Sequence, residues 1–343
     1  MRDQKVLCFG ELLLRMSPGK NGGWIQENNM PVYVGGAELN VATALAKWNI
    51  PSKYFTALPN YSLSQDLIIN LQEKNIDVSS INFSGNRIGT YFLEQGSDVK
   101  NADIIYDRMH TSFSELTPGM IDWKAVLEEV SWVHISAINP ALNKNAADVC
   151  LELLKAASAR GITISLDLNY RANFWRYGKN PIEVMSNLAQ YCDLIMGNIW
   201  AADDLLGVAV DENILKNRSK TSCIEHAQYT SEILMKNFPK VKHVANTFRF
   251  DKEDNSINYY STLCDKNKLY LSSEIHAIDI KDKIGSGDCF MAGLIYGFYN
   301  HMDPDKTINF AAAAAVGKMY EISDATNQTV QSVLLNATKN RAM

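Results

Sequence analysis

Residues 282–288 carry the residue types best suited to chemistry. They read Asp-Lys-Ile-Gly-Ser-Gly-Asp and run directly into an apolar stretch at 289–295 that predicts a helix. The unpaired amides of a helix N-terminus form an anion site, and Gly285 and Gly287 let a large ligand approach the backbone. Asp288, just inside the helix, would either favour the helix dipole or take a proton from a nucleophile that attacks a bound phosphate. A plain capped helix is the alternative interpretation.

A second glycine pair, Gly35-Gly36, opens onto an amphipathic helix that is expected to end at Trp48. Such an opening lets a polyhydroxylated ligand lie against backbone amides, and Asn40 adds both a donor and an acceptor. A tight turn without a ligand is the alternative.

Asp167-Leu168-Asn169-Tyr170-Arg171 follows an apolar strand. Its polar side chains are therefore expected at the carboxyl end of that strand, where open α/β sheets build their sites. The forked donors of Arg171 suit a phosphate or a carboxylate. A solvated loop is the alternative.

Tyr91, Tyr106 and Arg108 form a third group of polar and aromatic residues. Strand alternation places Tyr106 and Arg108 on the same face. A guanidinium beside a phenol suits a small ligand with a carboxylate or keto group, whereas a ladder of side chains facing solvent is the alternative.

Other familiar chemistries are absent from the sequence. The six histidines show no metal-ligand spacing, and no Gly-Lys pair is followed by Ser or Thr as a Walker A loop requires. The dinucleotide fingerprint also fails, because Phe290 occupies the position of its third glycine. A dehydrogenase is therefore not expected.

The elements that must position these residues alternate along the chain. Strands are expected at 6–10, 53–57, 132–136, 163–168 and 194–198, and helices at 38–48, 63–74 and 146–157. This order predicts an α/β fold with an open, mostly parallel sheet flanked by helices on both faces. Ligands of such sheets bind beyond the carboxyl ends of the strands.

Two segments, 12–34 and 87–110, break this rhythm with strand-like stretches and no helix between them. We expect a small β-sheet lid inserted into a single domain that spans residues 1–343. The exposed edges of such a sheet need covering, which favours a homo-oligomer formed through the lid.

Composition excludes several partners. A net charge of −5 without any basic run of five residues argues against nucleic acid and against anionic membrane surfaces. The apolar stretches fall short of the roughly 18 residues that span a bilayer. The six cysteines are scattered, with no C-x-x-C pair. These features predict reduced thiols and a cytoplasmic protein.

In this order the motifs resemble those of the ribokinase-like (PfkB) carbohydrate kinases over nearly the whole chain. The resemblance rests on 9–12, on Gly35-Gly36 with Asn40, on Asp167-x-Asn169-x-Arg171 and on the string at 282–288. It implies ATP and Mg²⁺ as cofactors and leaves a monovalent-cation requirement open. It also implies that Asp288 is the catalytic base, with an anion hole formed by Gly285, Ser286 and Gly287.

Within the family, the pattern is most similar to the kinases of 2-keto-3-deoxygluconate. This similarity rests on Tyr91, Tyr106-x-Arg108, His134-Ile135-Ser136-x-Ile138-x-Pro140 and Asn169-Tyr170-Arg171. It implies phosphorylation of a primary hydroxyl on a small keto-deoxy sugar acid to give the 6-phosphate. The substrate-binding residues would be Gly35, Gly36, Asn40, Tyr91, Tyr106, Arg108, Ile138 and Arg171.

The chain also departs from the family pattern. The Asn-x-x-Glu motif that helps to organise magnesium reads Asn198-Ile199-Trp200-Ala201, so that Asp203 or Asp204 would have to substitute and the metal ligands stay unassigned. The nucleotide would contact Asn198, Thr247, Arg249, Gly285 and Gly287. Arg15 stands where the family often has an acid that accepts a sugar hydroxyl, and this change is compatible with an acidic substrate.

Two other functions stay open at this point. One is a fructokinase- or ribokinase-type kinase of a neutral sugar, which should lose little when Arg108 is replaced. The other is a non-catalytic sugar-acid sensor, which would have no need of Asp288 and its glycines.

Overall fold

The computed structural model describes residues 4–18, 29–94, 104–212, 214, 218–254 and 256–339. Its central sheet has ten strands: β1 (Lys5–Phe9), β4 (Ser52–Phe55), β6 (Ile76–Asp77), β10 (Val130–Ser136), β11 (Thr163–Asp167), β12 (Leu194–Gly197), β13 (His243–Asp251), β14 (Ile257–Cys264), β15 (Leu269–Leu271) and β16 (Ile275–Ala277). The order is β15-β14-β13-β12-β11-β10-β1-β4-β6, with β16 also paired to β14. Pairs from β6 to β13 are parallel, and β14 to β16 add an antiparallel extension.

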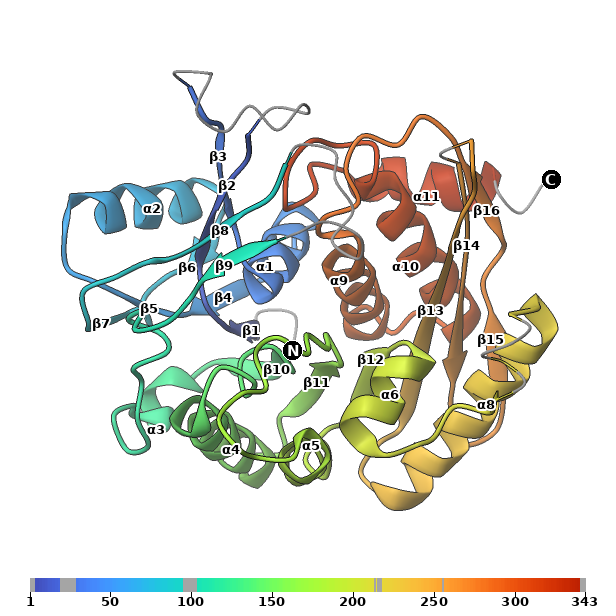
Figure 1. Cartoon of the computed structure of the whole chain (residues 1–343), viewed down its shortest axis with the longest axis horizontal. Helices are drawn as coiled ribbons and strands as arrows, with labels where there is room; N and C mark the ends of the chain where they lie inside the picture. The colour runs from blue at the N-terminus through green and yellow to red at the C-terminus, as the bar shows by residue number, and fades with distance from the viewer. Residues whose placement is uncertain are drawn as a thin grey trace.

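Helices cover both faces of this sheet (Figure 1). They are α1 (Ala37–Lys47), α2 (Ser62–Glu73), α3 (Trp123–Val126), α4 (Lys144–Ala159), α5 (Pro181–Ala189), α6 (Ile199–Leu206), α8 (Lys220–Asn237), α9 (Ser286–Tyr299), α10 (Pro304–Lys318) and α11 (Val330–Lys339). The prediction of an open, mostly parallel sheet between two helical layers is confirmed.

Strand β1 shows why the sheet is buried on both faces. Val6 and Cys8 belong to the apolar cluster that contains α1, α9 and α10, while Leu7 and Phe9 belong to the cluster on the other face with α4, α5 and α6. An uninterrupted apolar run is what a strand covered on both sides requires. The carboxyl ends of β1, β10, β11 and β12 consequently meet at one edge of the sheet.

Close packing fixes the helix that carries the 282–288 string. A Cβ added to Gly293 of α9 would lie 2.6 Å from the Cα of Ala311, and one added to Gly297 would lie 2.5 Å from Thr307 of α10. Small residues therefore let α9 and α10 approach closely, and the buried α9 holds its N-terminus in one place. Among the residues described, none of the helices combines the length and the apolar character needed to cross a membrane.

A smaller sheet lies apart from the central one. It has four strands in the order β3-β2-β8-β9: β3 (Val32–Gly35), β2 (Leu13–Met16), β8 (Gly89–Phe92) and β9 (Ile105–Asp107). Apart from Gly35, which ends β3, these strands fall within the two segments predicted to form a lid, of which 19–28 and 95–103 lie outside the described residues. Two further short strands, β5 (Ala57–Leu58) and β7 (Asn82–Phe83), pair with each other.

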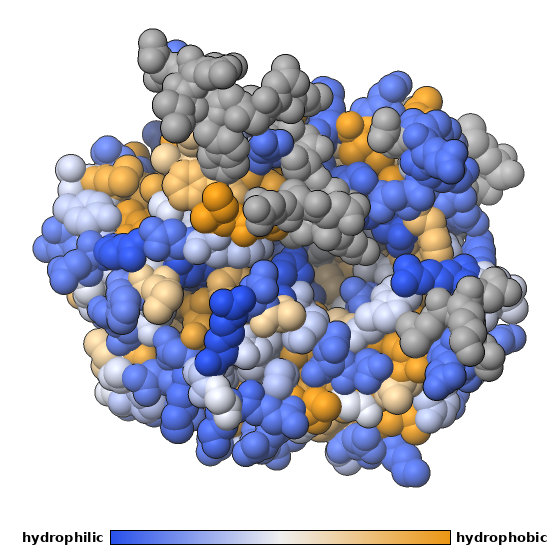
Figure 2. All heavy atoms as spheres, viewed as in Figure 1, coloured by the Kyte–Doolittle hydropathy of each residue, from blue (hydrophilic) through white to orange (hydrophobic). Residues whose placement is uncertain are grey.

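Apolar side chains gather over the small sheet on the face seen in Figure 2, which is otherwise mostly hydrophilic. At the two edges of the small sheet, Val32 of β3 and Ile105 of β9 are each about half exposed to solvent.

Candidate active site

A cavity of about 700 Å³ lies at the carboxyl ends of the parallel strands, between the central and the small sheet. Fourteen of the fifteen residues predicted as site residues line it: Gly36, Asn40, Tyr91, Tyr106, Arg108, Ile138, Arg171, Asn198, Thr247, Arg249, Gly285, Ser286, Gly287 and Asp288. Gly35 is not on its wall, because it packs against Asp324, whose Oδ2 lies 2.2 Å from the place of a Cβ at Gly35. The chain thus brings together residues that lie far apart in the sequence, and their individual roles stay predictions.

The N-terminus of α9 presents free amides to this cavity. Gly285 is the N-cap at φ 72°, no side chain caps the helix there, and the first backbone bond of the helix runs from Cys289 N to Gly285 O. The amides before Cys289 therefore have no partner within the helix. A Cβ at Gly285 would lie 1.8 Å from the carbonyl oxygen of Asp324, whereas a Cβ at Gly287 would meet nothing within 4 Å. Gly285 makes the turn, and Gly287 leaves space for a ligand.

Asp288 lies beside these amides and is 9% exposed. Asn40 donates a hydrogen bond from Nδ2 to Asp288 Oδ2 at 2.7 Å. Burial raises the pKa of Asp288 to about 7, although the hydrogen bond from Asn40 acts in the opposite direction. A carboxyl with a pKa near the working pH is well suited to general base catalysis.

Replacing Asn40 with Ala should move the acid limb of the kcat/KM profile to higher pH by about one unit. The reason is that a hydrogen bond to a charged group contributes roughly 1.5 kcal/mol or more, and one pKa unit corresponds to about 1.4 kcal/mol. Activity measured from pH 5 to 9 checks this shift. The control is Thr43→Ala, which removes a hydrogen bond to Leu39 O from the same helix without touching Asp288. An unmoved limb in Asn40→Ala would contradict the role of this bond.

Two guanidinium groups offer buried donors that have no partner in the described part of the chain. Arg108 pairs through Nε with Glu11 at 2.6 Å and lies over the Phe174 ring, but its Nη1 is unsatisfied. Arg171 donates from Nη1 to Tyr170 O at 2.8 Å, and its Nε is unsatisfied. Buried donors of this kind are costly unless a ligand satisfies them. The same holds for the unsatisfied acceptor Oδ1 of Asn40.

Two acidic residues on the wall were not assigned a role from the sequence. Asp167 ends β11 beside Asp288, and burial together with the nearby Asp288 charge raises its pKa well above the usual range. Asp324 accepts a hydrogen bond from Tyr91 Oη at 2.6 Å. The motif at 167–171 was a signal for Asp167, whereas no motif surrounds Asp324.

Three further basic residues also line the cavity. Arg218 and Lys283 line it in addition to Arg249, and the Arg218 guanidinium lies 5.1 Å from the centre of the Trp200 ring. Neither Arg218 nor Lys283 was identified from the sequence. Positive charge beside the α9 amides suits the phosphates of a nucleotide.

The structure also distinguishes the two candidate substitutes for the missing glutamate. Asp204 lines the cavity, whereas Asp203 accepts a hydrogen bond from Val210 N at 3.1 Å and is not on the wall. Within the described ranges, no cluster of three or more His, Cys, Asp or Glu side chains could hold a metal. Magnesium is usually bound by one or two carboxylates together with waters and substrate phosphates, so a single carboxylate such as Asp204 fits this ion.

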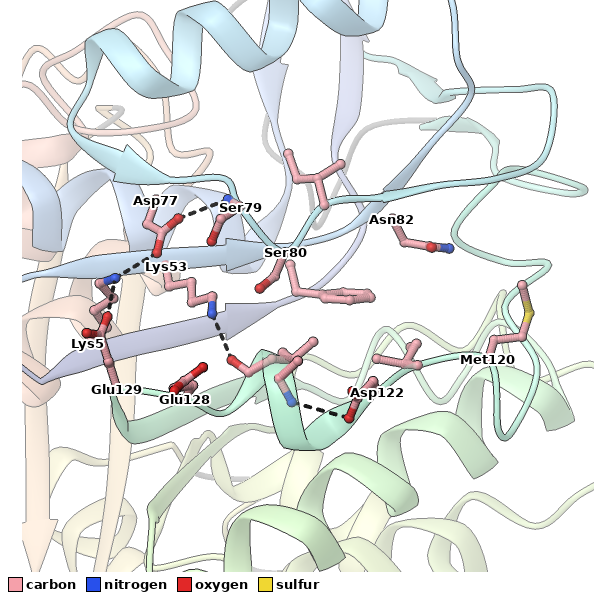
Figure 3. A pocket seen from close by; sticks show the side chains of 15 residues that line it. Lys5, Lys53, Asp77, Ser79, Ser80, Asn82, Met120, Asp122, Glu128 and Glu129 are labelled. Carbon is pink, nitrogen blue, oxygen red and sulfur yellow. Dashed lines mark hydrogen bonds and ion pairs between the residues drawn. The ribbon is translucent and has the colours of Figure 1, made fainter.

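A second cavity of about 590 Å³ is lined by Lys5 of β1, Lys53 of β4, Asp77 of β6 and residues around α3 (Figure 3). Lys5 is held there between Asp77 and Glu129, at 2.9 Å from each, and Lys53 donates to Val126 O. None of the predicted site residues lines this cavity. Lys5, Asp77 and Glu129 of this cavity pair with one another, and the predicted site residues line the first cavity instead.

Comparison with known proteins gives a consistent result. A family model described as pfkB family carbohydrate kinase matches residues 3–232. The chain is 27% identical to the 2-dehydro-3-deoxygalactonokinase of Haloferax volcanii over 50% of this chain, and 26% identical to the 2-dehydro-3-deoxygluconokinase of Bacillus subtilis over 61% of it. These matches span only 54% and 64% of the two relatives. The crystal structure of 2-dehydro-3-deoxygluconokinase from Thermotoga maritima superimposes with a TM-score of 0.88 at 30% identity, covering 98% of this chain and 99% of that one.

Proposed function

The chain belongs to the pfkB family of carbohydrate kinases, and on this premise we propose that it phosphorylates a small keto-deoxy sugar acid. The proposed reaction transfers the γ-phosphoryl group of ATP to the primary hydroxyl of 2-keto-3-deoxygluconate and gives the 6-phosphate. The names of the relatives support this substrate class, and the cavity described above supports it independently.

The observation that carries the substrate class is the pair of unsatisfied guanidinium donors, Arg108 Nη1 and Arg171 Nε. A carboxylate would satisfy both the charge and the hydrogen bonding of such groups, and a neutral hydroxyl would do so only in part. Tyr91 of β8 and Tyr106 of β9, whose stacked rings are 6.0 Å apart, line the same cavity as Arg108, which follows β9. We propose that these four residues hold the acid end of the sugar.

The other end of the sugar would lie at Asp288. Asp288 would take the proton of the primary hydroxyl, and Asn40 Oδ1 would accept a hydrogen bond from a neighbouring hydroxyl. The free amides at Gly285, Ser286 and Gly287 would stabilise the charge that spreads over the transferred phosphoryl group. Asp204 would help to hold magnesium, and the bound ion would supply positive charge against the nucleotide phosphates. We propose that the small sheet acts as a lid that excludes water from this reaction.

The rival functions have less support. A neutral sugar would offer hydroxyl acceptors to Arg108 Nη1 and Arg171 Nε but no negative charge, so it would match these buried cations less well than a carboxylate. A non-catalytic sensor disagrees with the family assignment, and a buried carboxyl with a pKa near neutrality is costly for a protein that only binds.

Replacing Arg108 with Lys should raise KM for the sugar acid by about 10-fold or more while leaving any turnover of neutral sugars unchanged. Lysine keeps a cation for Glu11 but loses the second arm of the guanidinium, and hydrogen bonds to charged groups contribute roughly 1.5–3 kcal/mol. Coupled assays of ADP release across a panel of keto acids and neutral sugars provide the measurement.

The matched control is Arg87→Lys, an exposed arginine of the small-sheet region that pairs with Asp107. It should behave like the wild type. Equal losses for acidic and neutral sugars in Arg108→Lys would contradict the proposed carboxylate contact, and a wild type that turns over only neutral sugars would overturn the substrate class.

We further propose that two copies pair through their small sheets, because the edge strands β3 and β9 expose Val32 and Ile105. Sedimentation equilibrium would test this, and a monomer at all concentrations would refute it. The six free, buried cysteines and the use of ATP support a cytoplasmic location.

A further inference from the structure

Arg15 occupies an unexpected place. It lies on β2 of the small sheet, it is fully buried, and it is not on the cavity wall. Its Nη1 is 3.0 Å from Asp282 Oδ2 and its Nε is 2.8 Å from Asp324 Oδ1, while the Tyr33 ring lies 4.3 Å from its guanidinium carbon. Arg15, which stands where the family often has an acid that accepts a sugar hydroxyl, therefore contacts carboxylates of this chain and does not face the cavity.

Both carboxylates that Arg15 contacts support the turn at the anion hole. Asp282 opens the 282–288 string, and its Oδ1 accepts a hydrogen bond from Ile284 N at 3.0 Å. Asp324 places its carbonyl oxygen against Gly285, where a Cβ would lie at only 1.8 Å. The two groups together leave the Gly285 turn little freedom.

Asp324 also connects Arg15 to Tyr91, one of the residues proposed to bind the sugar acid. Asp324 Oδ2 accepts the hydrogen bond from Tyr91, and Tyr91 stands on β8, which pairs directly with β2. Arg15 and Tyr91 are register partners in this pairing. A ligand that moves Tyr91 therefore also shifts the Asp324 carboxylate, which Arg15 contacts.

We propose that Arg15 is a positioning residue that couples the small sheet to the anion hole. Through Nη1 and Nε, Arg15 of β2 contacts Asp282 and Asp324, the two residues that hold the Gly285 turn. The small sheet and this turn therefore adopt their positions together. The inference rests on the proposed function in that the 282–288 string binds the transferred phosphoryl group. It predicts that sugar and nucleotide bind cooperatively, and this cooperativity must be reciprocal.

Calorimetric titration of the full chain with ADP, with and without sugar, tests the proposal. In the wild type we expect the sugar to tighten ADP binding by about 5-fold or more. Arg15→Lys keeps the buried positive charge, but lysine lacks the planar guanidinium that reaches both carboxylates. The ratio of ADP affinity with sugar to ADP affinity without sugar should therefore fall towards one. The control Arg87→Lys makes the same change at an exposed ion pair of the small-sheet region and should keep the wild-type ratio.

A second variant keeps the test decisive if Arg15→Lys does not fold. Asp282→Asn removes the charge that faces Arg15 Nη1 while its Oδ1 can still accept from Ile284 N, and it should lose the cooperativity in the same way. A folded variant of either kind with the wild-type ratio, or a wild type without cooperativity, would overturn the coupling role. The titration uses whichever sugar the wild type phosphorylates, so an error in the substrate class would show in the assay panel and not here.

Discussion

Replacing Asp288 with Asn is expected to lower kcat by roughly 10²–10⁴-fold, the usual contribution of a positioned general base. Affinity for sugar and nucleotide should stay close to that of the wild type. Asparagine has nearly the same size, and its carbonyl oxygen can still accept the hydrogen bond from Asn40. Steady-state kinetics together with titration of sugar and nucleotide separate the two effects.

The same substitution should stabilise the fold at pH 8. Burial raises the pKa of Asp288 from 3.8 to about 7, so between these values the folded chain holds a proton that the unfolded chain has lost. Wild-type stability therefore decreases as the pH rises through this range. The asparagine side chain of the variant carries no charge, and the gain at pH 8 should amount to a few kcal/mol at most, at about 1.4 kcal/mol per pKa unit.

Thermal unfolding at pH 4.5 and pH 8 measures this gain, which should be small at the lower pH. The control is Asp66→Asn, an exposed aspartate of α2, which should change neither turnover nor stability. Full turnover in Asp288→Asn would rule out the catalytic base. A variant less stable than the wild type at pH 8 would show that ionised Asp288 is not strained by burial.

Much of the fold could be predicted because the signals are local. The apolar run of β1 and the helical periodicity of α1 and α4 are readable from adjacent residues, and each element was predicted within a few residues of its observed ends. The strand expected at 53–57 was predicted less well. It divides into β4 and β5, because Ala57-Leu58 leaves the central sheet and pairs with Asn82-Phe83 of β7. Such a partner is not visible in a short window of sequence.

In the site, too, residues with a local sequence signal could be predicted, whereas residues defined by long-range contacts could not. Gly36, Gly285 and Gly287 could be predicted as site residues because they stand at helix entrances, and they lie on the cavity wall. Asp324 and the true position of Arg15 could not be found this way, because the Arg15–Asp282 pair joins residues 267 positions apart. The domain organisation predicted from the sequence stays a prediction.

Gly287→Ala is expected to give a folded and somewhat stabilised protein that has lost most of its activity. A Cβ at Gly287 meets nothing within 4 Å, and alanine is favoured over glycine in a helix by up to about 1 kcal/mol. The methyl group would nevertheless project into the cavity beside the free amides. Displacing the phosphoryl group by about 1 Å can cost 10²-fold in rate, and we expect a loss of about this size in kcat.

Gly285→Ala should show the opposite balance, with stability as the first loss. Its backbone is in the left-handed region, and the new Cβ would lie 1.8 Å from the Asp324 carbonyl oxygen. Alanine is strained there whatever ligand is present, so the loss should be visible in thermal unfolding without substrate. Comparing unfolding midpoints and kcat for both variants separates a glycine needed for the turn from one needed for the ligand. Wild-type turnover in Gly287→Ala would show that the transferred group does not lie against these amides.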